Sequence, residues 1–291
     1  MGRGSSRKEI SIPLSELLPI EDHYRSKATL SNRMSNVFLT LLGTSWFLLL
    51  LWSGSTIGVL GLLFYIGLFI SRKVKQTRAV KKNQLAVDLL NDMRYEDASF
   101  IFEELTLSEQ NSTSHPVYIF NRGVSFLLSG RHMRAFSLFN SVLRGRIFSF
   151  SDAYEPILLA DMATCLVLDG QVEEAAEFLN KASFAARSQD RGYVVFVQAL
   201  YYLRSGQMEK AFFYIVENWD LGEQKLRLPF RCAMSLLLAF SARMSGHEEY
   251  VNSSLDQIAF SKPSLLEFHW LIKKWPEMAS FMERELSKRE G

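Results

Sequence analysis

The residues that could bind a metal ion or transfer protons are scattered along the chain. The five histidines are His23, His115, His132, His247 and His269. None of them pairs with a second ligand at the spacing that zinc sites use. The pair His247-Glu248 begins like a zinc-protease motif, but the fourth position after the histidine is Val251. The pattern therefore predicts no metal site and no cofactor.

The acidic pairs and the thiols also have structural explanations. Glu173-Glu174 and Glu248-Glu249 stand where a helix is expected to begin, and acids there interact favourably with the helix dipole. Cys165 and Cys232 fall on apolar helix faces, which predicts buried reduced thiols. No phosphate-binding glycine loop and no nucleophile elbow occurs in the sequence. We therefore expect a protein that is not an enzyme and has no small-molecule substrate.

The charge composition narrows the class of partner. The chain has 291 residues and a net charge of only +2, which argues against a general nucleic-acid binder. Its length allows for a membrane segment and one further domain large enough to bury a core. A protein partner is therefore more consistent with the composition than a nucleic acid.

The strongest compositional signal is a charge-free run from Met34 to Ser71. As one helix the run would be about 57 Å long, whereas a bilayer core is about 30 Å thick. Ser53-Gly54-Ser55-Thr56 offers a turn near its middle. The sequence predicts a transmembrane hairpin with arms at Val37–Trp52 and Thr56–Ile70. A re-entrant loop, or one tilted helix with an interfacial piece, stays open as an alternative. A buried hairpin in a water-soluble fold is disfavoured, because so long an uncharged run is rare in such folds.

Basic residues flank this run on both sides. Such residues stay on the cytoplasmic side of a membrane, so basic flanks at both ends predict two crossings. The expected localisation is a multi-pass membrane protein with both terminal regions cytoplasmic and with the lipid bilayer as one partner. The residues expected at the membrane surface after the run are Arg72, Lys73, Lys75, Arg78, Lys81 and Lys82.

From Lys81 onward the sequence repeats itself at about 36 to 40 residues, a period typical of helical solenoids. Each unit has a small residue, then a turn, then a second small residue. The first small residues are Ala86, Gly123, Ala163, Ala199 and Ala239. The turn positions are Met93, Gly130, Gly170, Gly206 and Gly246, and the second small positions are Ala98, Ala135, Ala175, Ala211 and the bulkier Val251.

These anchors resemble the tetratricopeptide repeat (TPR) family over residues 81–258. The resemblance implies an all-α fold in which helix–turn–helix units stack, because one unit cannot bury its apolar face alone. The departures lie mainly in three connectors: a polar loop at Ser108–Pro116 and the longer stretches Gly145–Pro156 and Asp220–Pro229. Residues 264–289 are expected to form one or two capping helices, with Pro276 in a first turn.

The resemblance also implies a concave groove, lined by the first helix of each unit, that binds a partner protein. By register this groove is unusually apolar, which favours an amphipathic partner helix. Burial of the same residues by the chain itself, for example by the tail Ile10–Leu18, stays open. The expected groove residues are Phe120, Asn121, Val124, Leu127, Thr164, Tyr193, Phe196, Val197, Leu200, Leu236, Leu237 and Phe240.

The predicted organisation has five parts. They are a tail (1–33), the transmembrane hairpin (34–71), a basic segment (72–82), a TPR-like solenoid (83–260) and capping helices (261–291). The predicted function is a membrane-anchored scaffold that presents a cytoplasmic TPR-like domain to a protein partner. Two alternatives remain: a fixed structural subunit of a larger membrane machine, such as a secretion, motility or envelope complex, and an accessory domain that regulates a neighbouring enzyme by binding.

Overall fold

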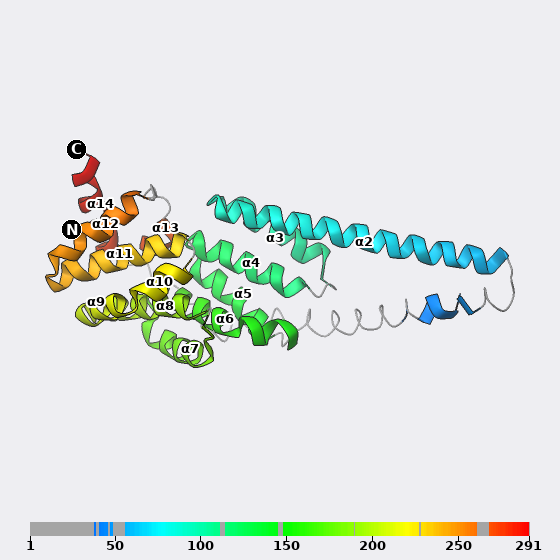
Figure 1. Cartoon of the computed structure of the whole chain (residues 1–291), viewed down its shortest axis with the longest axis horizontal. Helices are drawn as coiled ribbons and strands as arrows, with labels where there is room; N and C mark the ends of the chain where they lie inside the picture. The colour runs from blue at the N-terminus through cyan, green and yellow to red at the C-terminus, as the bar shows by residue number, and fades with distance from the viewer. Residues whose placement is uncertain are drawn as a thin grey trace, which may run out of the picture. The chain divides into compact units, whose positions relative to one another are not determined.

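The computed structural model describes residues 38, 41–45, 47–48, 56–110, 114–144, 148–188, 190–226, 228–260 and 268–290. Every regular element among them is helical (Figure 1). They belong to two compact units: residues 1–74 with 110–112, and residues 75–109 with 113–291. The helices are α2 (Thr56–Asn91), α3 (Tyr95–Ser108), α4 (His115–Leu128), α5 (His132–Arg144), α6 (Phe148–Asp169), α7 (Val172–Ala185), α8 (Arg191–Arg204), α9 (Met208–Glu217), α10 (Trp219–Lys225), α11 (Leu228–Ser245), α12 (Glu248–Phe260), α13 (His269–Ile272) and α14 (Pro276–Glu290).

The predicted membrane localisation is wrong. None of the helices in the described part of the chain is long and apolar enough to cross a membrane. The expected second arm lies in α2, whose uncharged part, Thr56 to Ser71, gives only about 24 Å of helix before Arg72 and Lys73 continue it. Most of the expected first arm, Val37–Trp52, lies outside the described residues. The two crossings and the cytoplasmic placement of both terminal regions are therefore withdrawn.

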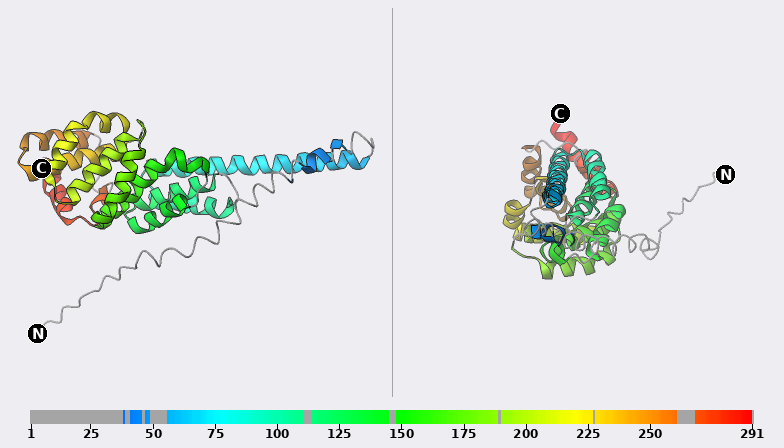
Figure 2. Two further views of the ribbon diagram at one scale, coloured as in Figure 1. Left: turned by 90° about the horizontal axis from the view of Figure 1, so that it is seen from below. Right: turned by 90° about the vertical axis from the view of Figure 1, so that its right-hand side faces the viewer.

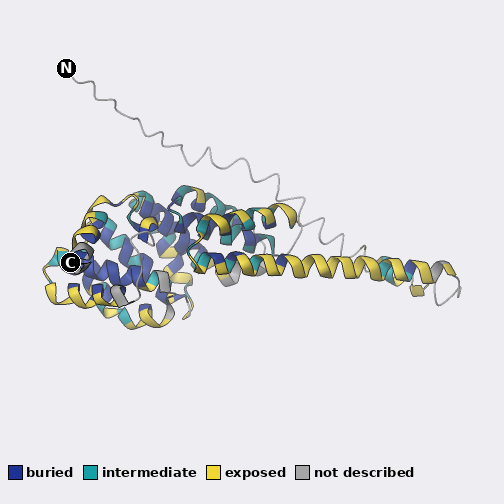
Figure 3. Ribbon diagram, turned by 90° about the horizontal axis from the view of Figure 1, so that it is seen from above, coloured by how far each residue is buried: buried dark blue, intermediate teal, exposed yellow. Residues whose placement is uncertain are grey.

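Within the first unit, the start of α2 is apolar on all sides. Leu60 and Phe64 are 66% and 63% exposed, and most of their neighbours up to Val74 are also exposed (Figure 3). A side chain at Gly43 would lie 2.8 Å from the Cζ atom of Tyr65, so these two residues are in close contact. This part of α2 therefore has a large apolar surface that the described residues of the first unit do not cover.

The second unit confirms the all-helical repeat expected from the sequence. Its helices form successive pairs: α4 with α5, α6 with α7, α8 with α9, and α11 with α12 (Figure 2). The end of α2 shares a buried cluster with α3 and forms the first pair with it. Two connectors differ from expectation. Helix α6 begins at Phe148 and contains Pro156, and α10 occupies much of the expected Asp220–Pro229 connector. Buried residues line the interior between the pairs in Figure 3.

The turns within the pairs share one backbone geometry. Gly130, Gly170, Gly206 and Gly246 all have positive φ, between 70° and 91°. The next residue closes the turn by donating its backbone N–H five residues back, as in Arg131 N to Phe126 O at 2.8 Å. This is the Schellman arrangement, which ends a helix by a left-handed residue and is easiest for glycine. The repeated glycines therefore set where each first helix ends.

Small residues let the two helices of a pair approach closely. All ten predicted small positions are buried. A Cβ atom at Gly123 would lie 2.6 Å from Cε1 of Phe139, which is itself fully buried on α5. Large side chains on the second helices fill the space that small residues leave on the first helices.

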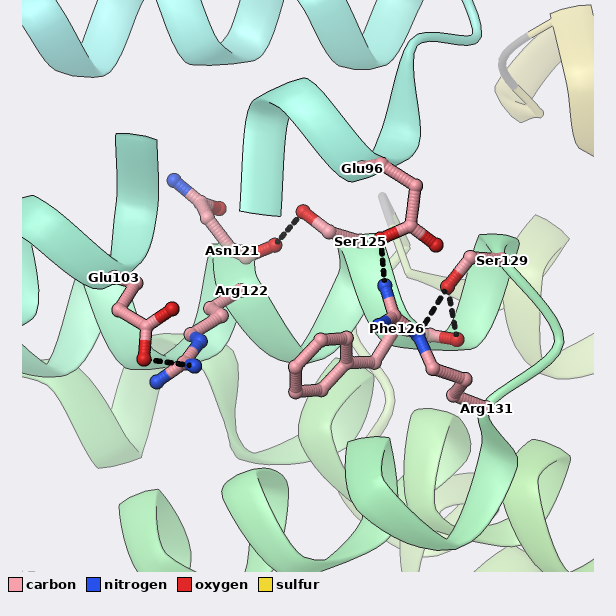
Figure 4. Close-up of polar contacts among 8 residues, drawn as sticks. All are labelled: Glu96, Glu103, Asn121, Arg122, Ser125, Phe126, Ser129 and Arg131. Carbon is pink, nitrogen blue, oxygen red and sulfur yellow. Dashed lines mark hydrogen bonds and ion pairs between the residues drawn. The ribbon is translucent and has the colours of Figure 1, made fainter. Parts of the chain in front are cut away.

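Polar contacts fasten the first pair to the second (Figure 4). The guanidinium groups of Arg122 and Arg131 lie 5.3 and 4.3 Å from the centre of the Phe126 ring. Arg122 forms an ion pair with Glu103 at 2.7 Å, and Arg131 forms one with Glu96 at 2.6 Å (Figure 4). Two residues of α3 are thus tied to the second pair around one buried aromatic ring.

Met93 occupies the glycine position of the first turn and has φ of 60°. An L-residue in this region costs about 1–2 kcal/mol per residue. We expect Met93→Gly to raise the free energy of unfolding by about 1 kcal/mol, because the strain is relieved and little packing is lost. Urea unfolding followed by circular dichroism measures this change. Gly206→Ala is the matched control: its Cβ would meet nothing within 4 Å, so the φ of 76° alone should make it destabilising. If both variants changed the free energy of unfolding in the same direction, the explanation by backbone strain would be contradicted.

Candidate protein-interaction surface

Two of the histidines contact other parts of the helical stack. The Nε2 atom of His132 lies 2.8 Å from the carbonyl oxygen of Trp270, and burial lowers the pKa of His132 to about 4. The ring of His247 stacks on Phe212 with a centroid distance of 4.1 Å. Both cysteines are buried free thiols. Within the ranges that the structure describes, no group of three or more His, Cys, Asp or Glu could hold a metal ion.

Most of the expected groove residues are buried by the chain itself. They lie on the first helices α4, α6, α8 and α11, as their register predicted, but they are at most 2% exposed. In this conformation a partner cannot reach them. The buried members of the predicted set are Leu127, Thr164, Phe196, Val197, Leu200, Leu236, Leu237 and Phe240.

The aromatic part of this surface is covered by a stretch we call the C-terminal segment, Phe268–Glu285. Trp270 lies 6.3 Å from Phe196 and 5.7 Å from Phe230, measured between ring centres. Trp275 and Phe281 each lie 5.4 Å from Phe240. Helix α13 also packs on α4, and Figure 1 shows it between α4 and α11. The segment thus crosses several helical pairs rather than only capping the last one.

Polar contacts accompany the aromatic ones. Lys274 forms an ion pair of 2.7 Å with Asp169 at the end of α6. Glu285, only 6% exposed, accepts a contact of 3.2 Å from Nη2 of Arg243 on α11. The guanidinium of Arg204 lies 5.1 Å from the ring centre of Trp275. We call Phe196, Phe230, Phe240, Asp169, Arg204 and Arg243 the covered face.

Three predicted groove residues on α4 keep partial exposure. Phe120 and Asn121 are adjacent, and Val124 lies one turn further along the helix. Tyr154 of α6, 44% exposed, has its ring centre 6.4 Å from that of Phe120. The Asn121 amide donates to the Asn83 side chain at 3.3 Å. Phe120, Asn121, Val124 and Tyr154 together form what we call the open face.

The fourth partly exposed member of the predicted set, Tyr193, belongs to a buried polar cluster instead. Its hydroxyl donates to Oδ1 of Asp161 at 2.6 Å, and the Thr164 hydroxyl lies 3.5 Å from the same phenolic oxygen. Burial raises the pKa of Asp161 to about 7, although the Tyr193 hydrogen bond partly opposes the rise. The phenol of Tyr193 also has a pKa well above its usual value because it is buried. Asp161 is thus a buried carboxyl group whose pKa is raised well above its usual value.

The basic residues expected at a membrane surface lie on α2 and are exposed. Two of them form ion pairs with α3: Lys75 with Glu109 at 3.2 Å, and Lys82 with Glu104. These contacts help to fix α3 against α2. Their role at a membrane surface was inferred from the two predicted crossings, so without the crossings it remains an untested prediction. The residues concerned are Arg72, Lys73, Lys75, Arg78, Lys81 and Lys82.

The covering by Phe268–Glu285 was not predicted from the sequence. Residues 264–289 were expected to cap the solenoid, and the chain's own N-terminal tail was considered as an occupant of the groove. A signal did exist: Trp270, Trp275 and Phe281 place three large aromatic side chains in one short segment. What the sequence alone does not give is the surface against which these aromatics pack.

No family model and no curated protein matches the chain. Among solved structures, it is similar to the nearly identical TPR-like repeats of a protein assigned as a kinesin light chain from Podosopora anserina, with 18% identity, coverage of 64% of this chain and 98% of that chain, and a TM-score of 0.44. It is also similar to MamA from Desulfovibrio magneticus RS-1, with 18% identity, coverage of 64% and 97%, and a TM-score of 0.41.

Proposed function

We propose that this chain is a protein-interaction scaffold that binds a partner protein through the open face. The observation that supports this most directly is the partial exposure of Phe120 and Val124 on α4, beside the exposed ring of Tyr154. An amphipathic helix of a partner can lay its apolar side against such a row. Asn121 adds a polar group that can fix the register of the partner.

The proposal predicts which substitutions abolish binding. Phe120→Asp or Val124→Asp should weaken partner binding by about 30-fold or more, since each puts a charge into the centre of an apolar contact. The measurement is affinity capture with the full chain as bait, with quantification of every protein that is retained. Circular dichroism of each variant confirms that the fold is intact.

The matched control is Phe184→Asp on α7. Phe184 is 96% exposed, so its replacement changes a large surface aromatic outside the open face. A partner that binds the open face is retained by this variant and lost by the two α4 variants. If folded α4 variants retain the same proteins as the unmodified chain, the open face is not the binding surface.

A fixed subunit of a larger assembly is a second candidate. The exposed apolar side chains of α2, including Leu60 and Phe64, favour it, because large exposed apolar patches mark surfaces that another molecule covers. In that case Leu60→Glu with Phe64→Glu would release the chain from a complex of constant stoichiometry. A scaffold with exchanging partners gives a complex whose composition changes with conditions.

A further inference from the structure

The contacts of the C-terminal segment differ in position from those that hold the helical pairs together. Between the pairs the core contains fully buried side chains of the second helices, such as Phe139, Leu179 and Ile215. The segment instead meets the first helices through Phe196, Phe230 and Phe240. The buried side chains of the segment belong to the same core as those of the helical pairs, and they reach it from the side of the first helices.

The segment also has a separate polar contact for several pairs in turn. The backbone oxygen of Trp270 meets His132 of the second pair, and Lys274 meets Asp169 of the third. The charge on Glu285 meets Arg243 of the fifth pair. A chain laid across successive repeats, with aromatic anchors and charged contacts at Lys274 and Glu285, resembles a peptide ligand bound in a groove.

We propose that the C-terminal segment is an intramolecular ligand that competes with a partner helix for the covered face. The partner would carry aromatic side chains spaced as Trp270, Trp275 and Phe281 are, and a carboxylate in the place of Glu285 for Arg243. This inference rests on the proposed scaffold function and adds a second, closed binding surface to it. Binding of such a partner releases the segment, so the chain reports occupancy by exposing residues 268–285.

Competition within one chain has a predictable size. A tethered ligand acts at an effective concentration in the millimolar range. For a free peptide of micromolar affinity, the tethered copy should weaken apparent binding by about 1000-fold. The unmodified chain should therefore ignore a peptide of its own sequence that an opened chain binds well.

The test uses a fluorescent peptide with the sequence Phe268–Glu285 and two full-length chains. One chain is unmodified and the other carries Trp270→Ala with Trp275→Ala, which removes the two aromatic anchors of the tethered copy. Fluorescence anisotropy should show tight binding to the variant and about 1000-fold weaker binding to the unmodified chain. A peptide with the same two substitutions is the control and should bind neither chain.

Two results overturn the proposal. One is a folded variant that does not bind the peptide, and the other is equal binding by both chains. If the variant does not fold, hydrogen exchange of the unmodified chain decides. Exchange of amides in the segment while α8 and α11 stay protected supports release, whereas exchange only together with α8 and α11 makes the segment a fixed part of the core. Either outcome is independent of partner capture through Phe120, so the two proposals fail separately.

Discussion

Phe139→Ala is expected to lower the free energy of unfolding by about 3–5 kcal/mol, the usual cost of removing a fully buried phenylalanine. The ring lies against the backbone of Gly123 and 5.5 Å from the ring centre of Phe120. Its removal leaves a cavity between α4 and α5, and a cavity there cannot close because the turn after α4 fixes the two helices. Urea unfolding followed by circular dichroism measures the loss.

The control for Phe139 is Phe184→Ala, which removes the same side chain from a site that is 96% exposed. A surface change of this kind usually alters stability by less than about 0.5 kcal/mol. A second check is Gly123→Ala, whose Cβ would overlap the Phe139 ring, combined with Phe139→Leu. The double variant should be more stable than the sum of the two single changes predicts. Additive effects would show that Gly123 and Phe139 are not packed together.

The helical repeat could be predicted from the sequence because its determinants are local. A glycine at the end of a first helix specifies a left-handed turn, and Gly130, Gly170, Gly206 and Gly246 all have that geometry. Alanine or glycine at the crossing points specifies close helix approach, as at Gly123. Even the exception at Met93 follows the pattern, since the position keeps its positive φ without glycine.

The membrane prediction failed because the ends of a helix cannot be located from the apolar run alone. The sequence predicts a second arm that ends at Ile70, whereas in the structure α2 begins at Thr56 and continues through charged residues to Asn91. Hydropathy measures how apolar a segment is, and it does not give the first and last residues of the helix that contains the segment. The exposed Leu60 and Phe64 therefore still need a covering surface, and this need supports the assembly candidate.

The candidate site was harder to predict because it depends on contacts that are distant in sequence. Register correctly placed Phe196 and Phe240 on first helices, but whether such a face is open depends on residues far along the chain. In this chain, Trp270 packs on Phe196 and Trp275 packs on Phe240, so this face is closed. Local patterns fix which side of a helix is apolar, while only the folded chain fixes what lies against that side.

Asp161→Asn is expected to remove a fall in stability between about pH 4 and 7. The variant keeps the opposite rise that His132 gives over much of this range, since burial lowers the pKa of His132 to about 4. The folded pKa of Asp161 is about 7, whereas the value without the fold is 3.8. Below pH 3.8 the carboxyl is protonated in both states, and its contribution to stability is fully present. As pH rises toward 7 the unfolded chain ionises first, so stability falls. The difference between the two pKa values corresponds to a loss on the order of 4 kcal/mol above pH 7.

The measurement is the urea midpoint of the unmodified chain and of the Asp161→Asn variant across this pH range. Asparagine keeps an oxygen for the Tyr193 hydroxyl but cannot ionise, so the stability of the variant relative to the unmodified chain should increase as pH rises. Tyr193→Phe is the informative second variant. The Tyr193 hydrogen bond holds the pKa of Asp161 down, so its loss should move the falling limb to higher pH. Parallel curves for the unmodified chain and the asparagine variant would mean that Asp161 is ionised in the folded protein throughout, with a charge that the helical stack stabilises.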